Sequence, residues 1–336
     1  MKKAEVYLQL QPLIDAPPAT PQQLYGQACS NDQATVNSWR KTWISQIKAN
    51  KERFGSFAEH GIGQLFRKYL NQPVIVAGAG PSLKGNAEKL KNRGSIPLVS
   101  CLHNFHYFED LGLAPEFYVT LDAGPVTIEE VTEGGTKTAE EYWALTKDRT
   151  LLAFTGTHPD LLAKWQGKIY FFNCPIPDKE VEAEVQAIEN FNLWVSTGGN
   201  VLGACTYIAK GFLGASTVIF VGADFCFSYD HKFHAWDSKY DANLGTCVRL
   251  TDIYGIPRLT WQSYANFKGW FDYVAIQVPG HWINASEGGC LGSYQGGNIR
   301  AFQYQTLDEV FTMYGMTKHL EAQVKNPEVE AKIILF

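Results

Sequence analysis

The sequence lacks several features that define whole classes of proteins. Its seven cysteines are scattered over 336 residues without a C-x-x-C pair, so neither a disulfide framework nor a clustered zinc site is predicted, and a reducing compartment is expected. No apolar run approaches the roughly 20 residues that cross a bilayer. An acid and two glutamines interrupt the N-terminal residues too early for a secretory signal. We therefore expect a cytoplasmic protein without a membrane partner.

Positive charge is also scarce. Lys and Arg total 29 against 34 Asp and Glu, which gives a formal net charge of −5, so a basic surface for nucleic acid is not predicted. Apolar residues make up 45% of the chain and charged residues 19%, a balance that excludes global disorder and permits a sizeable core. The length allows one large domain or two modest ones.

The first 70 residues differ from the rest of the chain. Prolines are frequent in the first third of this segment. Aromatic and aliphatic residues, including Trp39 and Trp43, then recur at helical spacing. This pattern predicts an irregular arm with a strand at residues 4–10, a helix opened by a capping box at Ser30, and a second helix near residues 57–70. We interpret residues 1–70 as an N-terminal helical extension.

Short apolar runs alternate with helical candidates from residue 71 onward. Such alternation predicts an α/β fold in which helices cover both faces of a parallel sheet. Residues 228–300, rich in aromatics, histidines and glycines, are expected to form long loops around a site. The expected divisions are 1–70, 71–300 and 301–336, the last with a closing helix at 305–325. The expected strands cover residues 73–77, 96–101, 117–121, 151–154, 169–172 and 217–221.

The strongest local signal is the turn Gly78-Ala79-Gly80-Pro81-Ser82-Leu83, which directly follows the first strand. Glycines let main-chain N–H groups approach an anion, and a following helix start adds positive partial charge. Leu83 stands where a dinucleotide fingerprint needs its third glycine, and no P-loop motif occurs. The spacing therefore favours either a mononucleotide phosphate site or a purely structural turn.

Polar residues follow several other strands. Asn104, Asp122 and Asp224 each stand at or after the end of an expected strand, so they should face one crevice. The run Ser196-Thr197-Gly198-Gly199-Asn200 opens a helix and forms either a second anion seat or an ordinary N-cap. His231 and His234, in a loop beyond Asp224, are acid–base candidates, with a structural role as the alternative.

These residues together resemble a known family. The glycine turn, the segment from Asn104 to Phe108, Asp122, the run from Ser196 to Asn200, the segment Val221-Gly222-Ala223-Asp224-Phe225 and the stretch from Ile283 to Gly289 follow one another as in the motility-accessory-factor (Maf) family. That family also includes archaeal 6-hydroxymethyl-dihydropterin diphosphokinases and is more distantly similar to bacterial sialyltransferases. The resemblance covers roughly residues 70–295.

The resemblance implies a Rossmann-like domain that binds a nucleotide or nucleotide sugar, without a tightly bound cofactor. Maf-like and sialyltransferase-like proteins often self-associate, so the resemblance leaves a homo-oligomer open, while the sequence does not give the oligomeric state. On this reading Asp122 and Asp224 line the crevice beside the nucleotide. The other implied nucleotide-binding residues are Gly78, Gly80, Ser82, Asn104, Ser196, Thr197, Gly198 and Gly199.

Three functions stay open at this point. The first is a glycosyltransferase with a CMP-sugar-like donor and an unknown acceptor, in which His234, in preference to His231, removes the acceptor's proton beside Asp224. Asn284 and Glu287 would then belong to loops that close over the acceptor.

The second function is ATP-dependent diphosphate transfer to a hydroxymethyl-pterin-like heterocycle, with Mg²⁺ on Asp122 and Asp224. The third is a nucleotide-binding module without catalysis, because Cys226 stands where sialyltransferases place a phosphate-stabilising tyrosine.

Overall fold

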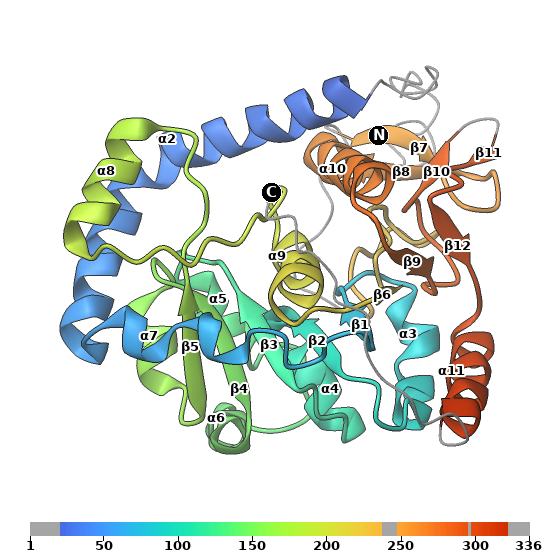
Figure 1. Cartoon of the computed structure of the whole chain (residues 1–336), viewed down its shortest axis with the longest axis horizontal. Coiled ribbons are helices and arrows are strands. Elements are labelled where there is room, and N and C mark those ends of the chain that lie inside the picture. The colour runs from blue at the N-terminus through green and yellow to red at the C-terminus, as the bar shows by residue number, and fades with distance from the viewer. Residues whose placement is uncertain (1–20, 237–246, 295–296, 322–336) are drawn as a thin grey trace.

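The computed structural model describes residues 21–236, 247–294 and 297–321, and an eight-stranded parallel sheet forms its centre (Figure 1). The strand order is β12-β9-β6-β1-β2-β3-β4-β5. The strands are β1 (Pro73–Ala77), β2 (Leu98–Cys101), β3 (Phe117–Thr120), β4 (Thr150–Phe154), β5 (Lys168–Phe172), β6 (Thr217–Val221), β9 (His281–Asn284) and β12 (Phe302–Tyr304).

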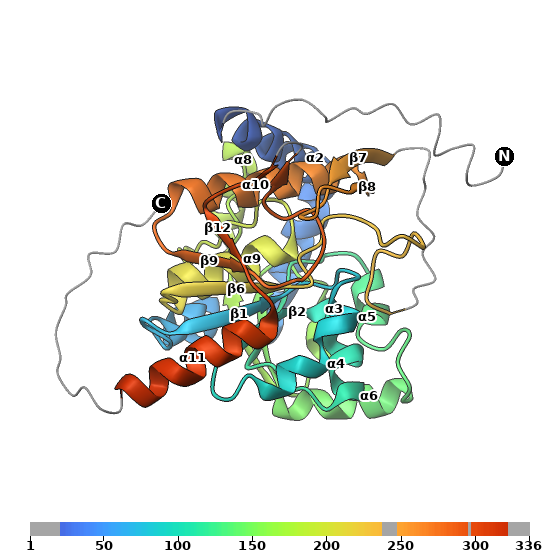
Figure 2. The ribbon, with the colours of Figure 1, turned by 90° about the vertical axis from the view of Figure 1, so that its right-hand side faces the viewer.

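Helices cover both faces of the sheet, which is why its strands are apolar without alternation. Every residue of β6 and the last four of β1 are buried. Figure 2 shows α9 and α10 on one side of these strands and α4 and α11 on the other. The helices that follow β1 to β5 are α3 (Leu83–Asn86), α4 (Phe105–Leu111), α5 (Val126–Glu130), α6 (Ala139–Leu145), α7 (Pro159–Lys164), α8 (Lys179–Ile188) and α9 (Val201–Tyr207).

The α/β fold predicted from the sequence is confirmed. All six predicted strands are present, and none of their boundaries differs by more than two residues. The helix predicted to follow Ser196–Asn200 is α9, which continues without a break into a π-helical turn, Ile208–Phe212. The predicted closing helix is α11 (Leu307–Glu321).

The N-terminal extension differs from its prediction. Its long helix α2 (Pro21–Phe54) begins nine residues before Ser30, and proline suits a first helical position because it needs no N–H there. Residues 57–70 form only the 3-10 helices Phe57–His60 and Ile62–Leu65, so the single helix predicted there is wrong. The predicted strand at 4–10 lies outside the described residues. Helix α2 runs across the body and contacts α7, α8 and α10 (Figure 1).

The prediction that residues 228–300 surround a site is confirmed by Phe233, His234, Trp261, Tyr264 and Phe267, which line a pocket, but the prediction of long loops is wrong for most of residues 247–284. This part of the chain forms the hairpin of β7 (Cys247–Thr251) and β8 (Pro257–Trp261) and helix α10 (Gln262–Gln277). It also contains β9 and the short pair β10 (Ser293–Tyr294) and β11 (Gly297–Asn298). Helix α10 shows little amphipathic pattern because it is covered by α2 on one side and the hairpin on another. Its polar residues Lys268 and Asp272 are buried as an ion pair at 2.7 Å.

A carboxylate fixes the C-terminal end of α2 to the body. Glu189 accepts hydrogen bonds from Lys51 Nζ (2.5 Å), Ser56 Oγ (2.8 Å) and the main-chain N–H groups of Phe57 (3.0 Å) and Ala58 (3.1 Å). Burial acts to raise the pKa of Glu189, but these hydrogen bonds outweigh it and lower the pKa to about 2. Because the folded pKa lies below the ordinary value of 4.5, the stabilisation is complete above that pH and is lost as pH falls toward 2.

We expect Glu189→Gln to lower the free energy of unfolding at pH 7 by about 1–3 kcal/mol, since hydrogen bonds to a charged group are lost. Urea unfolding of wild type and variant between pH 7 and pH 3 should show the difference shrinking as acid is added. Glu184→Gln is the control, because Glu184 forms only an exposed ion pair with Arg40 at 3.1 Å and should change stability by less than about 1 kcal/mol. A difference for Glu189→Gln that stays constant over the whole pH range would contradict this role of the carboxylate.

Candidate functional site

An open pocket lies where the strand order reverses. Strand β1 pairs with β2 on one side and with β6 on the other, and ligands of such sheets bind at the carboxyl ends of the strands at this switch point. A pocket of about 780 Å³ occupies that place. Its walls come from the loops after β1, β2, β3 and β6, from the start of α9 and from β8 and α10.

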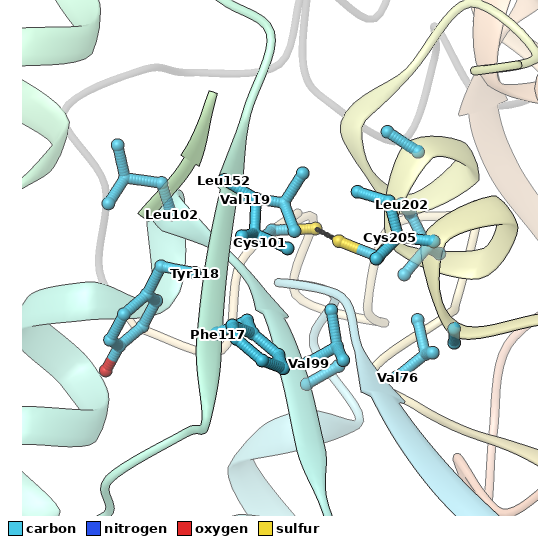
Figure 3. Close-up of a cluster of buried hydrophobic side chains, with 14 of the residues drawn as sticks. Val76, Val99, Cys101, Leu102, Phe117, Tyr118, Val119, Leu152, Leu202 and Cys205 are labelled. Carbon is cyan, nitrogen blue, oxygen red and sulfur yellow. Dashed lines mark hydrogen bonds between the residues drawn. The ribbon is translucent and has the colours of Figure 1, made fainter. Parts of the chain in front are cut away.

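The floor of the pocket is formed by the end of β2 and by α9. Cys101 and Leu202 line the pocket. The sulfur of Cys101 lies 4.0 Å from the sulfur of Cys205 on α9 (Figure 3). Val76 and Val99 of the sheet complete this apolar layer in the same view. The described cysteines, from Cys101 to Cys290, form no disulfide.

The glycine turn after β1 packs directly on the turn after β6. Gly78 N–H donates to Val221 (2.9 Å) and Gly80 N–H to Gly222 (2.9 Å). A Cβ at Gly78 would lie 2.5 Å from the Gly222 carbonyl oxygen, and one at Gly80 would lie 2.7 Å from it. Glycine is therefore required at both positions so that the two main chains can approach, and these N–H groups already have protein acceptors.

Asp224 fills the anion seat that the sequence predicts at this turn. Its carboxylate accepts from the main-chain N–H of Ser82 (3.2 and 3.3 Å) and from Ser82 Oγ (2.8 Å). Burial raises the pKa of Asp224 to about 6 although the hydrogen bonds from Ser82 oppose this. On the other side, Gly289 packs so tightly on Asp224 that a Cβ there would lie 2.4 Å from the Asp224 Cα. The N–H groups of Gly78, Gly80 and Ser82 thus have protein acceptors, and Asp224 joins three loops.

Asn104 supports the turn from behind instead of facing the pocket. Its side chain is fully buried, and Nδ2 donates to the carbonyl oxygen of Gly78 and to Ser100 Oγ, both at 3.0 Å. The nucleotide contact implied for Asn104 by the family resemblance is therefore replaced by a role in holding Gly78.

The run at residues 196–200 contributes only its end to the pocket. Thr197 Oγ1 accepts from Gly199 N–H (3.1 Å), Asn200 Oδ1 accepts from Gly203 N–H (2.9 Å), and Gly198 packs against Trp270. Of the predicted residues Ser196, Thr197, Gly198 and Gly199, only Gly199 lines the pocket. The N–H groups of Val201 and Leu202, at the start of α9, have no acceptor among the described residues.

A pair of carboxylates faces the pocket from the end of β3 and from α5. Asp122 lines the pocket as predicted, and Glu130, which the sequence did not indicate, lies with it. Desolvation by the surrounding protein raises the pKa of Asp122 to about 7, and the charge of Glu130 adds to this rise. The Asp122 side chain is nonetheless exposed to solvent within the pocket. Burial and then the charge of Glu133 raise the pKa of Glu130 to about 7 as well.

Two histidines line the pocket with these acids, His103 and His234, but they are poor bases. His103 Nδ1 lies 3.5 Å from Glu130 Oε1, and its ring lies 4.3 Å from that of His234, which stacks on Trp236 at 4.9 Å. Burial lowers the pKa of His103 to about 4 and that of His234 to about 2, so both are neutral at physiological pH. His231 does not line the pocket and lies in the turn from Ser228 to Lys232. The lowered pKa of His234 therefore does not support its predicted role as the general base.

Asn284 and Glu287, expected over the acceptor, are built into the fold. The buried Asn284 donates from Nδ2 to Leu291 (3.1 Å). Glu287 accepts from Lys89 Nζ (2.8 Å) and from the first N–H of α11 at Leu307 (3.0 Å). Neither residue lines the pocket in this structure, and their role in closing over an acceptor stays a prediction.

Four aromatic residues that the sequence did not single out form another part of the pocket wall. The aromatic wall consists of Phe233, Trp261, Tyr264 and Phe267, all half-buried and all lining the pocket. The described lining contains three carboxylates, from Asp122, Glu130 and Asp224, and no Lys or Arg. Among the described residues, no group of three or more His, Cys, Asp or Glu side chains could by itself hold a metal ion.

Comparison with known proteins confirms the resemblance found in the sequence motifs. The model of a family described as 6-hydroxymethylpterin diphosphokinase MptE-like matches residues 48–230. Among solved structures, the chain is similar to a Maf glycosyltransferase from Magnetospirillum magneticum AMB-1, with a TM-score of 0.56 and 15% identity over 84% of this chain and 42% of that chain. The present chain thus spans less than half of that protein, and the likeness shows the fold alone. A comparison with curated proteins found no match. None of the described helices is both long and apolar enough to span a bilayer.

Proposed function

The chain belongs to the 6-hydroxymethylpterin diphosphokinase MptE-like family, and on that premise we propose that it transfers diphosphate from a nucleoside triphosphate to a hydroxyl group of a second substrate. Family and fold support a transferase. The choice of a metal-bound triphosphate as donor rests on one observation, which is the charge of the pocket.

Three carboxylates and no Lys or Arg line the described pocket. A nucleotide's phosphates would be repelled by these charges at close range. A donor with a second acidic group, such as a CMP-activated sialic-acid-like sugar, would be repelled further. Phosphates can enter such a pocket only with compensating charge, and Mg²⁺ characteristically binds through one or two carboxylates together with substrate phosphates.

Asp122 and Glu130 fit such a cation. Burial and neighbouring acidic charge raise the pKa of both carboxyl groups, and a bound divalent cation would favour their ionised forms. Because two carboxylates do not complete a coordination shell, phosphate oxygens and water would supply the rest. When bound, the cation would neutralise charge on the transferred group. Asp224, tied to Ser82, is a weaker candidate than the sequence suggested.

The start of α9 is the part of the chain that suits phosphate oxygens. Val201 and Leu202 line the pocket with N–H groups that have no acceptor among the described residues. The helix continues through the π-helical turn to Phe212, and its N-terminal end carries positive partial charge. The phosphate site therefore shifts from the glycine turn to this helix start.

Nucleotide binding with and without metal tests the proposal. We expect ATP or GTP to raise the thermal midpoint of the full chain in Mg²⁺ and to have little effect in EDTA, since only bound ligand stabilises the fold. Release of AMP or GMP with 6-hydroxymethyl-dihydropterin as acceptor would then report turnover. Nucleotide binding that is equally tight in EDTA would contradict the proposal, and metal-dependent binding without turnover would favour the non-catalytic module.

Glycosyl transfer is the second candidate, and the fold match over 84% of the chain to a Maf glycosyltransferase favours it. It predicts binding of a CMP- or UDP-sugar without metal. In the same thermal-shift series, a larger shift by a nucleotide sugar in EDTA than by any triphosphate in Mg²⁺ would favour glycosyl transfer over diphosphate transfer.

A further inference from the structure

The carboxylate of Asp122 is placed by the main chain of its loop. Among the described residues, no side chain or N–H group donates a hydrogen bond to this carboxylate, which is exposed within the pocket. The Asp122 N–H donates to Thr120 Oγ1 (3.3 Å), and the Asp122 carbonyl oxygen accepts from the N–H of His158 in the loop after β4 (3.1 Å). The loops after β3 and β4 thus hold each other at the carboxyl edge of the sheet.

Helix α2 reaches the loop after β3 from outside the sheet. Gln46 Nε2 donates to the carbonyl oxygen of Ala123, the residue that follows Asp122, at 2.8 Å. The ring of Trp39 packs on Gly124, where an added Cβ would lie 3.3 Å from Trp39 Cη2. One loop residue beyond the carboxylate is therefore held by a hydrogen bond and the next by packing.

The same face of α2 also holds the loop after β4. Asn50 stands four residues after Gln46, a spacing that places both side chains on one side of a helix. It is fully buried, and its Nδ2 donates to the carbonyl oxygens of Thr155 and Thr157, both at 2.8 Å. Helix α2 therefore braces both of the loops that meet at Asp122.

Most of α2 lies outside the part of the chain that matches the family model. The match begins at residue 48, whereas α2 begins at Pro21, and both Trp39 and Gln46 precede the match. Figure 1 shows α2 running across the body of the molecule. The contacts that fix the loop of Asp122 thus come in part from a segment that the family motifs do not include.

We propose that Gln46 is a positioning residue, which holds the loop after β3 so that the Asp122 carboxylate can bind the cation. This inference rests on the proposed function, because Asp122 binds a cation in that reaction. The Gln46 amide is uncharged, so it fixes the loop without competing for the carboxylate as a lysine would. Residues that only orient a metal ligand typically change metal affinity or activity by about 10- to 100-fold when they are replaced.

Gln46→Met tests this role, since methionine keeps the length and helix preference of glutamine but donates no hydrogen bond. In the metal-free full chain, we expect hydrogen exchange of the main-chain amides at residues 121–124 to become about tenfold faster, as for the loss of one hydrogen bond. Affinity for Mg²⁺-ATP, measured by isothermal titration, should fall by about 10- to 100-fold. Ser45→Met is the matched control, because Ser45 is exposed on the same helix and should change neither quantity.

A second variant, Trp39→Leu, removes the ring that packs on Gly124 and keeps the test available should Gln46→Met fail to fold. We expect it to speed exchange at residues 121–124 and to weaken Mg²⁺-ATP binding in the same direction. Faster exchange over the whole chain would mark a general loss of stability and would count against a local role.

The two readouts separate this inference from the proposed function. Exchange is measured without metal or nucleotide, so it decides whether Gln46 holds the loop even if wild type binds no Mg²⁺-ATP, in which case the proposed function alone fails. Unchanged exchange at residues 121–124 in both folded variants would overturn the inference. So would faster exchange combined with wild-type affinity for Mg²⁺-ATP, because the loop would then be held without consequence for the site.

Discussion

Replacing Glu130 by glutamine should lower kcat/KM for transfer by at least about 100-fold. Mutation of residues that only support a metal ligand already lowers metal affinity or activity by about 10- to 100-fold, and Glu130 is proposed as a direct ligand. The loss should not come from unfolding. Burial and the charge of Glu133 raise the pKa of Glu130, so its ionised form is unfavourable in the folded state. A neutral glutamine should therefore leave the thermal midpoint at pH 8 equal to that of wild type or above it.

Steady-state kinetics at several Mg²⁺ concentrations, with thermal melts of the same samples, would measure both effects. Asp122→Asn should behave in the same way. Glu129→Gln is the matched control, because Glu129 is an exposed residue on the same helix and does not line the pocket. If Glu130→Gln kept full activity and needed the same Mg²⁺ concentration as wild type, Asp122 and Glu130 would not be the metal-binding pair.

Replacing Gly80 by alanine should cost about 3–5 kcal/mol of folding free energy, from overpacking and from lost hydrogen bonds to a buried carboxylate. The new Cβ would collide with the Asp224 carboxylate and would lie 2.7 Å from the Gly222 carbonyl oxygen. The main chain of the neighbouring turn cannot rotate away as a side chain can. Asp224 would have to leave Ser82, which separates the loops after β1 and β6.

Chemical denaturation and a thermal midpoint lowered by about 5–15 °C would register this loss. Gly85→Ala is the control from the same region. Gly85 lies in α3 with open space around its position, and alanine there should be neutral or slightly stabilising. If Gly80→Ala were as stable as wild type, the glycine turn would be able to move away from Asp224. Its main-chain N–H groups could then bind an anion, as the sequence analysis allowed.

The sequence was enough to predict some of the residues that line the pocket at the strand ends. Asp122 and the glycine turn were expected at the pocket because carboxyl ends of parallel strands share one edge of a sheet. Glu130 and the aromatic wall were not. Glu130 lies on a helix whose exposure could not be known in advance, and the wall residues sit in a segment that lacks a clear period because it is covered from two sides.

The sequence by itself determined the parallel sheet, since continuous apolar runs such as residues 74–77 can be satisfied only between two helical layers. It also determined where the chain must turn closely, through Gly78 and Gly80. Only the tertiary structure decided what occupies that turn. Asp224 is 142 positions from Ser82 along the chain, and no local pattern reveals that one fills the hydrogen bonds of the other. Hydrogen bonds between residues far apart in the chain, such as Ser82 and Asp224, decide which amides and carboxylates remain open to a ligand.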